Sequence, residues 1–340
     1  MASQNDKIIF ILGHGWSGTT LLNKVLTAHP QIYFINWEFN EFGVFYRRQS
    51  RYRKYGTRKY EIMTKDFFQH PKIRQNDFNY SSIDWSNIKN FQDWFNLIFN
   101  YYRQKTNKPI IGVKVANNLQ KVKNTIANIN LIKMMFSDTY CFQIVRDPRD
   151  IFLSFRKIRV LPWFLSPYYF GKFWVKAITT IRSLNKSVKY YEVRYEDLIS
   201  QPQREIEKIC QFIEVDFSPE MLKFYQKVDQ TRPNQCNLKK NFIATNFNKW
   251  KSQLSPKVAK LISTASASEM TELGYLENNS NYQIRFWRKI WEAIKTYIFI
   301  VTNLLELGNQ KKRFEYLLGL AGLKLKKYLP PLYWLLKDRK

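Results

Sequence analysis

The sequence predicts an α/β fold in which helices cover both faces of a parallel sheet, with an added C-terminal helical extension. Short apolar segments alternate with helix-forming segments along residues 1–280, a pattern typical of parallel strands joined by crossover helices. A loop of small residues separates the first apolar segment from the first helical one. The composition then changes at residues 281–340, which are basic and aromatic and are expected to form a separate extension.

The expected elements are short and follow one another closely. Five segments rich in Ile, Val, Phe or Tyr are predicted to be strands: Lys7–Gly13, Gln31–Asn36, Pro109–Val115, Thr139–Val145 and Val188–Arg194. Six further segments are predicted to be helices: Ser17–Ala28, Asn90–Gln104, Arg149–Arg156, Phe170–Leu184, Pro202–Ile213 and Pro219–Lys227. Ligands of such sheets bind at the carboxyl ends of the strands, so functional residues are expected there.

The chain is strongly basic, with 55 Lys and Arg against 27 Asp and Glu and a formal net charge of +28. Such a charge favours anionic partners, although a biased composition without any special partner explains it too. The basic residues are dispersed and no recognition motif is present, so no nucleic-acid partner is expected. The 3 Cys are far apart and the 3 His lack ligand spacing. Neither a disulfide framework nor a metal site is therefore expected, and the pattern favours a cytoplasmic location.

Residues 45–74 differ from their surroundings because they are both basic and aromatic. Two interpretations are open for this segment. It is either a solvated insertion whose tyrosines pack on the sheet edge, or a wall of an acceptor cleft that attracts an anionic substrate.

The segment GHGWSGTT, from Gly13 to Thr20, links the first strand to the first helix. A strand, a turn of small residues and a helix form an anion cradle in that order, and Gly13 and Gly18 have the spacing of a P-loop. Thr19 stands where a P-loop for nucleotide triphosphates has its lysine. The predicted fold is therefore a P-loop-like sheet whose phosphate loop lacks the usual lysine.

The segment YCFQIVRDPRDIFLSFRK, from Tyr140 to Lys157, predicts a second anion site. Arg146 ends a strand, and Ser154 lies eight residues later in a helix that Pro148 opens. An arginine guanidinium is a planar, always charged fork that suits a phosphate. The RDPRD turn alone is equally explained by salt bridges, but a nucleoside with phosphate at both ends would use both sites.

Four motifs in this order resemble those of sulfotransferases that use 3′-phosphoadenosine 5′-phosphosulfate (PAPS): GHGWSGTTLL, IVRDPRDIFLS, VRYEDLISQPQREIEKICQFI and NKWKSQLSP. The resemblance covers residues 7–275, and SGTTLL followed by AHP is closest in style to the carbohydrate and protein-tyrosine branches. It implies in-line transfer of a sulfuryl group from PAPS, without a metal ion, to a hydroxyl of a glycan, glycolipid or secondary metabolite.

The resemblance also implies which residues bind the donor. The first loop would bind the 5′-phosphosulfate, the Arg and Ser of the second motif would bind the 3′-phosphate, and the Tyr of the third would face the nucleotide. The basic segment of the fourth motif would close over the 3′-phosphate, although Ser-Pro in that motif is also a good helix start. The expected donor-binding residues are Gly15, Trp16, Ser17, Gly18, Thr19, Thr20, Arg146, Ser154, Tyr195, Lys249, Trp250 and Lys251.

One departure from the family pattern concerns Trp16, which stands where these enzymes have a cation that steadies the bridging oxygen. Lys114 matches a lysine of related enzymes and is the expected substitute, with His14 as the weaker candidate. Glu38 is the expected general base and Glu41 the alternative, while ordinary surface roles remain open for Glu38 and Lys114. The competing functions are a P-loop kinase or nucleotide hydrolase, and a catalytically impaired nucleotide-binding relative.

Residues 281–340 carry 13 Lys and Arg against 4 Asp and Glu, with Trp set among aliphatic residues. Their longest uncharged run, Thr296–Leu305, is too short to span a bilayer. Basic amphipathic helices of this kind suit an anionic membrane surface, so a peripheral membrane location is one expectation. Packing on the domain or on a second subunit is the alternative, and the sequence leaves the oligomeric state open.

Overall fold

A computed structural model of the chain describes residues 7–71, 73, 77–115, 122–135, 139–157, 166–227, 238, 240–277 and 291. In this part of the chain, one sheet has the strand order β2-β3-β1-β4-β5, and every neighbouring pair is parallel. The strands are β1 (Ile8–Gly13), β2 (Ile32–Glu38), β3 (Ile110–Lys114), β4 (Tyr140–Val145) and β5 (Lys189–Arg194). The α/β fold predicted from the sequence is confirmed, and each strand overlaps its predicted segment, although β2 continues beyond Asn36 to Glu38.

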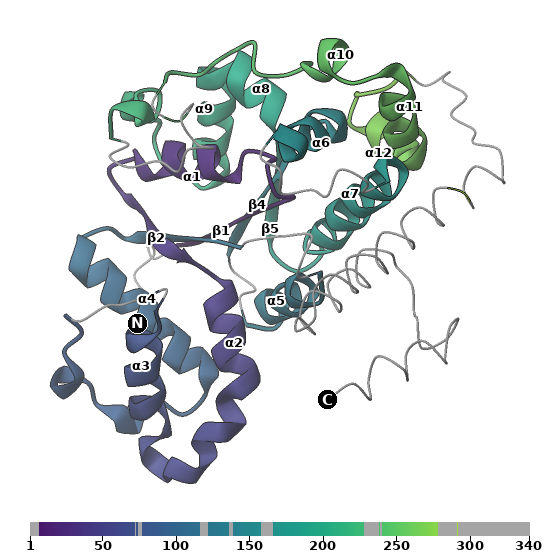
Figure 1. Cartoon of the computed structure of the whole chain (residues 1–340). Helices are drawn as coiled ribbons and strands as arrows, with labels where there is room; N and C mark the ends of the chain where they lie inside the picture. The colour runs from purple at the N-terminus through teal and green to yellow at the C-terminus, as the bar shows by residue number, and fades with distance from the viewer. Residues whose placement is uncertain are drawn as a thin grey trace, which may run out of the picture.

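Helices connect and flank the strands (Figure 1). The α-helices are α1 (Thr19–Thr27), α2 (Asn40–Arg48), α3 (Lys59–Gln69), α4 (Phe91–Thr106), α5 (Val122–Met135), α6 (Pro148–Lys157), α7 (Pro167–Arg182), α8 (Tyr195–Ser200), α9 (Pro202–Phe212), α10 (Trp250–Gln253), α11 (Pro256–Ala265) and α12 (Ala267–Glu272). The 3₁₀ helices are η1 (Gln49–Arg58), η2 (Tyr80–Ser82), η3 (Trp85–Asn87), η5 (Pro219–Met221) and η6 (Phe224–Lys227).

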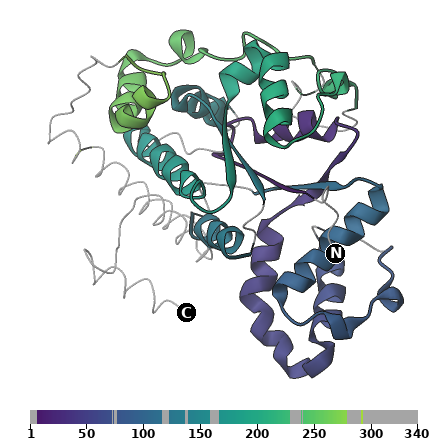
Figure 2. The same cartoon turned by 180° about the vertical axis from the view of Figure 1, so that it is seen from behind.

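The two faces of the sheet are covered by different sets of helices, and the alternation of side chains along β1 shows how. Ile9 and Ile11 pack with α1, α8 and α9, whereas Phe10 and Leu12 pack with residues of α2, α3, α4, α5 and α7. Successive strand residues point to opposite faces, so an apolar strand of this kind needs cover on both sides. Figure 2 shows the two layers from behind.

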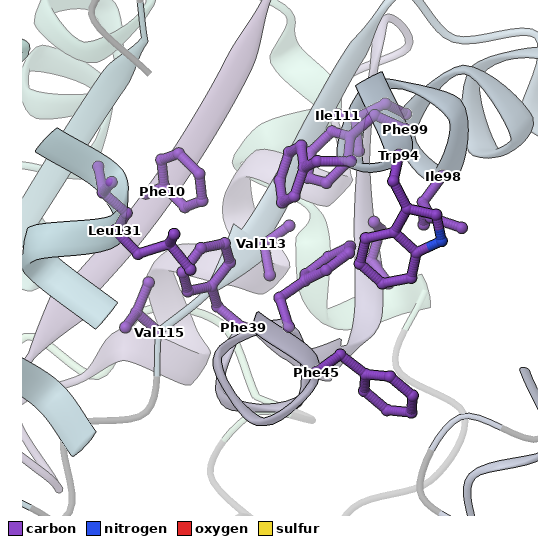
Figure 3. Packing of buried hydrophobic residues seen from close by; sticks show 14 of the residues in the cluster. Phe10, Phe39, Phe45, Trp94, Ile98, Phe99, Ile111, Val113, Val115 and Leu131 are labelled. Atoms are coloured by element: carbon purple, nitrogen blue, oxygen red, sulfur yellow. The ribbon is translucent and has the colours of Figure 1, made fainter. Parts of the chain in front are cut away.

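The segment from α2 to α4 forms a helical unit with an aromatic interior (Figure 3). Phe45, Phe67 and Trp94 are buried there, and the Trp94 indole donates to Thr64 Oγ1 at 2.9 Å. The basic residues of η1 are on the outside, at the end of the unit farthest from the sheet (Figures 1 and 2). In residues 45–74 the aromatic side chains therefore serve mainly as core, and the described arginines of η1 are remote from the strand ends.

The prediction of one helix over Pro219–Lys227 was wrong, because the segment forms two short 3₁₀ turns instead. Its backbone N–H groups bond to carbonyls three residues back, as in Met221 N to Ser218 O at 3.0 Å. Met221 and Phe224 are both buried against α1 and its neighbours. The tighter turns let both side chains face that core within a few residues.

A separate cluster of buried apolar side chains joins α6 and α7 to α11 and α12. Gly171 of α7 crosses α11 so closely that a Cβ at this glycine would lie 2.8 Å from Ile262 O. This packing fixes α10 and α11 beside the end of β4, next to the site described below. Apart from Trp291, the extension expected at residues 281–340 lies outside the described residues. No helix within the described ranges is both long and apolar enough to cross a membrane.

Candidate active site

The loop between β1 and α1 bends at two residues with positive φ, Trp16 at 65° and Gly18 at 107°. A Cβ at Gly18 would lie 2.5 Å from a ring carbon of Tyr195, and a Cβ at Gly13 would lie 2.8 Å from Ile144 O. Both glycines are thus required by close approach, and Gly18 also by its backbone conformation. The loop leads directly into α1, whose first turn carries no side-chain cap, so its N–H groups face the loop as anion donors.

Ser17 is the residue of this loop that most plainly lacks a partner. Its side chain is fully buried, and its Oγ has no hydrogen-bond partner within the described part of the chain. A buried hydroxyl without a partner costs free energy, which an anion held in the loop would offset. The loop, the start of α1 and this hydroxyl therefore fit a bound phosphate group. Thr19 and Thr20 form the first turn of α1.

Arg146, directly after β4, connects three distant segments. Its Nη1 donates to Trp16 O at 3.2 Å, its Nη2 donates to Asn246 O at 3.1 Å, and its guanidinium lies 4.3 Å from the Tyr195 ring centroid. The side chain is buried, and among the described residues its Nε has no partner. The guanidinium therefore retains hydrogen-bonding capacity beside the first loop. Ser154, further along α6, donates to Asp150 O at 2.9 Å.

A segment around residue 246 closes this side of the site. Asn246 Nδ2 donates to Tyr195 OH at 2.7 Å, and Lys249 Nζ donates to Asn246 Oδ1 at 2.6 Å. Trp250 N donates to Asp150 Oδ1 at 2.9 Å. Burial raises the pKa of the Asp150 carboxyl, and the nearby Arg146 charge opposes that shift. Lys251 is exposed, and its ammonium lies 6.0 Å from the Trp250 ring centroid.

The turn after β4 is held by a buried ionic network. Arg149 donates to both oxygens of Asp147, lies 3.7 Å from the Trp250 ring centroid and donates to Tyr275 O at 3.0 Å. Glu196 accepts from Asp147 N at 3.0 Å and from Tyr275 OH at 2.8 Å. Burial raises the pKa of the Glu196 carboxyl, and these donated bonds act in the opposite sense. The RDPRD turn is therefore salt-bridged as well as adjacent to the anion site.

At the other side of β1, Glu38 and Lys114 form an ion pair. The Lys114 Nζ to Glu38 Oε1 distance is 3.5 Å, and the two residues are register partners on β2 and β3. The Glu38 side chain is 40% exposed and the Lys114 side chain is 26% exposed, so both groups are accessible to a ligand. Lys114 also lies opposite Ile11 on β1, two residues before the loop begins. The sequence-predicted base and cation thus meet at the carboxyl ends of adjacent strands.

Glu41, the alternative base, has a different environment. It is buried in α2, and its Oε2 lies 3.7 Å from His70 Nδ1. That position is within the helical unit, so the structure brings Glu38, but not Glu41, into contact with Lys114.

His14, the weaker candidate for the missing cation, is enclosed by aromatic rings. Its Nδ1 lies 2.8 Å from Gly15 O, and Phe155 and Phe170 contact the imidazole ring edge to face. Burial lowers the pKa of His14 to about 4, against its ordinary value of 6.5. The imidazole is therefore neutral near pH 7, and it cannot replace a lysine or arginine there.

Sequence reasoning missed Asn246, which links Arg146 to Tyr195 and Lys249. The residue belongs to the segment NFNKW, where several similar asparagines occur, and no local pattern marks it. Within the described ranges, no group of three or more His, Cys, Asp and Glu could hold a metal ion.

Comparison with protein families matches residues 9–219 to the sulfotransferase family. The sulfotransferase domain of the Synechococcus PCC 7002 olefin synthase has a similar structure, at 20% identity and a TM-score of 0.50, covering 78% of this chain and 97% of that one. The sulfotransferase domain of the curacin biosynthetic pathway has 19% identity, a TM-score of 0.52 and the same coverages. Comparison with curated proteins gave no match. The chain belongs to the sulfotransferase family and is a sulfotransferase, as the four motifs indicated.

The buried His14 predicts an acid-sensitive stability. Its folded-state pKa lies below the unfolded value, so the unfolded chain binds more protons between pH 6.5 and about 4. The contribution is fully present above pH 6.5 and is lost as the pH falls, by about 3 kcal/mol in all. In urea unfolding at pH 7.5 and 4.5, we expect His14→Asn to lose less free energy of unfolding than the wild type. Equal losses in both proteins would contradict this role for His14.

Proposed function

We propose that the protein transfers the sulfuryl group of PAPS to a hydroxyl of a glycan, glycolipid or secondary metabolite. The observation that carries the proposal is the contact between the two anion sites, in which Arg146 Nη1 donates to the carbonyl of Trp16. A nucleotide with a 5′-phosphosulfate on the glycine loop and a 3′-phosphate beside Arg146 would use both. The family match supports this donor, because sulfotransferases of this family generally use PAPS.

In this proposal, the loop from Gly15 to Thr20 binds the 5′-phosphosulfate through backbone N–H groups and hydroxyls. Arg146 binds the 3′-phosphate with its remaining N–H groups, and the Ser154 hydroxyl turns from Asp150 O to the phosphate. Tyr195, beneath the Arg146 guanidinium, faces the nucleotide. The later basic segment, Lys249 to Lys251, covers the same phosphate from α10 and the residue before it.

The reaction is an in-line displacement at sulfur. The acceptor oxygen bonds to sulfur as the bond from sulfur to the bridging oxygen of the 5′-phosphate breaks. Glu38 takes the proton of the acceptor hydroxyl, and the Lys114 ammonium stabilises the negative charge that develops on the leaving phosphate. Lys114 thereby supplies the cation that Trp16 does not. Before the donor binds, Lys114 and Glu38 lie 3.5 Å apart as an ion pair.

The assignment of the 3′-phosphate predicts a ligand-specific effect of Ser154→Ala. We expect 3′-phosphoadenosine 5′-phosphate to bind about 5- to 10-fold more weakly, because one hydrogen bond to a charged group is lost. Adenosine 5′-phosphosulfate, which lacks a 3′-phosphate, should bind as it does to the wild type. Isothermal titration calorimetry with both nucleotides measures this. Ser200→Ala is the matched control, since the Ser200 hydroxyl also bonds to the carbonyl four residues back but outside the site. An equal loss of affinity for both nucleotides would contradict the assignment of Ser154 to the 3′-phosphate.

The assignment of the base predicts that Glu38→Gln lowers kcat by about 100-fold or more, in line with general-base contributions. Donor affinity should change little, because Glu38 acts on the acceptor. ³⁵S transfer from PAPS to a panel of glycans, lipids and phenols identifies an acceptor and then measures the rates. Glu41→Gln is the comparison, and we expect it to keep kcat while it lowers the free energy of unfolding. The opposite pattern would exchange the roles of the two carboxylates.

We also propose that residues 281–340 bind an anionic membrane surface and bring the enzyme to lipid-linked acceptors. Basic residues near an anionic leaflet contribute about 1 kcal/mol each, and salt screens them. A chain ending at Leu276 should keep nucleotide binding but lose affinity for phosphatidylserine vesicles, most clearly at low salt. Phosphatidylcholine vesicles provide the neutral control. If the full chain ignores the anionic vesicles, the extension has a packing or subunit-contact role instead.

A further inference from the structure

A line of polar side chains leads from the protein interior to Glu38. Glu38 Oε2 lies 3.5 Å from Asn40 Nδ2, and Asn40 Oδ1 accepts a hydrogen bond of 2.6 Å from Asn128 Nδ2. Asn40 begins α2, whereas Asn128 lies on α5 and is fully buried. Burying an amide costs free energy, so a fully buried asparagine between two helices is a feature that needs a reason.

The carboxylate fixes the direction of this line of hydrogen bonds. An ionised carboxylate only accepts, so Asn40 must turn its NH₂ group toward Glu38 and its oxygen toward Asn128. Asn128 must then donate from its own NH₂ group. The Asn40 amide has two orientations, related by a flip that exchanges its oxygen and its NH₂ group. The bond from Asn128 to the oxygen favours the orientation in which the NH₂ group faces Glu38. Asn128 therefore determines which end of the Asn40 amide meets Glu38.

The surroundings of the Asn128 oxygen agree with this direction. Its Oδ1 lies over Gly43 of α2, where a Cβ would collide with it, and the same Cβ would lie 3.1 Å from Arg47 Nη1. The oxygen of the amide thus lies against α2 at Gly43, without a hydrogen-bond partner among the described residues, and the NH₂ group faces Asn40. The absence of a side chain at Gly43 is what allows α5 to bring Asn128 this close to α2.

The backbone between Glu38 and Asn40 is held independently. Phe39 N donates to Lys114 O at 3.0 Å, and the Phe39 ring is fully buried in the aromatic core. Strand β3 therefore fixes one side of Glu38 through its backbone and through the Lys114 ammonium. The Asn40 amide approaches the other carboxylate oxygen. Glu38 is held between a cation and a neutral donor, each on a different oxygen.

We propose that Asn128 is a positioning residue for Glu38, and that it acts through Asn40 by keeping an N–H donor on the carboxylate. The inference rests on the proposed role of Glu38 as the base. It adds α5, which carries Asn128, to the elements that orient the Glu38 carboxylate. The charged groups described around this line are Lys114 on β3, Arg47 on α2 and the pair of Glu41 with His70.

The test replaces Asn128 by aspartate, which keeps the shape but removes the donor. Asn130→Asp is the matched control, because it makes the same change at an exposed position of the same helix. With Asn128→Asp, we expect kcat to fall about 10-fold, with KM for PAPS unchanged, since one hydrogen bond to a charged group is lost. The acidic limb of the pH–rate profile should move to higher pH, because the ionised base has lost a donor. Asn130→Asp should leave both quantities at wild-type values.

Two further measurements keep the test decisive. Asn40→Ala should reproduce the effects of Asn128→Asp, and adding Asn128→Asp to Asn40→Ala should cause no further loss, because Asn128 acts only through Asn40. If Asn128→Asp does not fold, Asn128→Ala, which is uncharged and also lacks the donor, takes its place in the comparison with Asn40→Ala. Additive losses, or an acidic limb that Asn40→Ala leaves in place, would overturn the proposal.

The outcome is separable from that of the proposed function. If the wild type transfers sulfuryl groups and Glu38→Gln abolishes transfer, but the asparagine variants retain the wild-type pH profile, only the positioning role fails. If no acceptor is found, NMR of the Asn40 side-chain amide decides. Its solvent exchange should be at least about 10-fold slower in Asn128→Asp than in Asn130→Asp, because the NH₂ group turns from the accessible Glu38 carboxylate to the buried aspartate that replaces Asn128. Equal exchange would show that Asn128 does not hold Asn40.

Discussion

The close approach of β1 and β4 at Gly13 is the constraint on which the site depends. The absent side chain lets the end of β1 lie against Ile144 O, and Arg146 follows two residues later on the same side of the loop. Strand β3 borders β1 on its other edge and sets Lys114 opposite Ile11. Because parallel strands end at one edge, this register alone gathers a glycine loop, a guanidinium and an ammonium from three separate parts of the chain.

A second layer of interactions keeps that arrangement rigid. The carboxylates of Asp147 and Glu196 are buried, and burying such charges is costly unless each is paired or hydrogen-bonded. Arg149 and Tyr275 provide those bonds and, with Trp250, tie the segment after residue 240 to the end of β4. Removing Arg149 would leave the buried Asp147 carboxylate without its ion-pair partner. The network thus couples the closure of the site to the packing of α11 and α12.

The sequence predicted the sheet well because each strand is buried on both faces and is therefore a nearly continuous apolar run. It did not predict α2 and α3, since their core residues, such as Phe45 and Phe67, are interspersed with exposed arginines and tyrosines that suggested an insertion. Motifs located Arg146 and the glycine loop. Asn128 left no such trace, because its partner Asn40 is 88 residues away and the contact arises only when α5 packs on α2.

The position of Lys114 has a consequence for how a loop with Trp16 can support transfer. Trp16 has a left-handed backbone, and its ring lies 3.9 Å from the Phe155 ring centroid, so its side chain closes the loop with apolar surface. In the proposed mechanism the cation then comes from β3, next to Glu38, rather than from the loop itself. Base and cation would share one ion pair in the resting enzyme. As Glu38 takes the acceptor proton, its charge is lost and Lys114 becomes available to the leaving phosphate, so that the two steps of charge transfer favour one another.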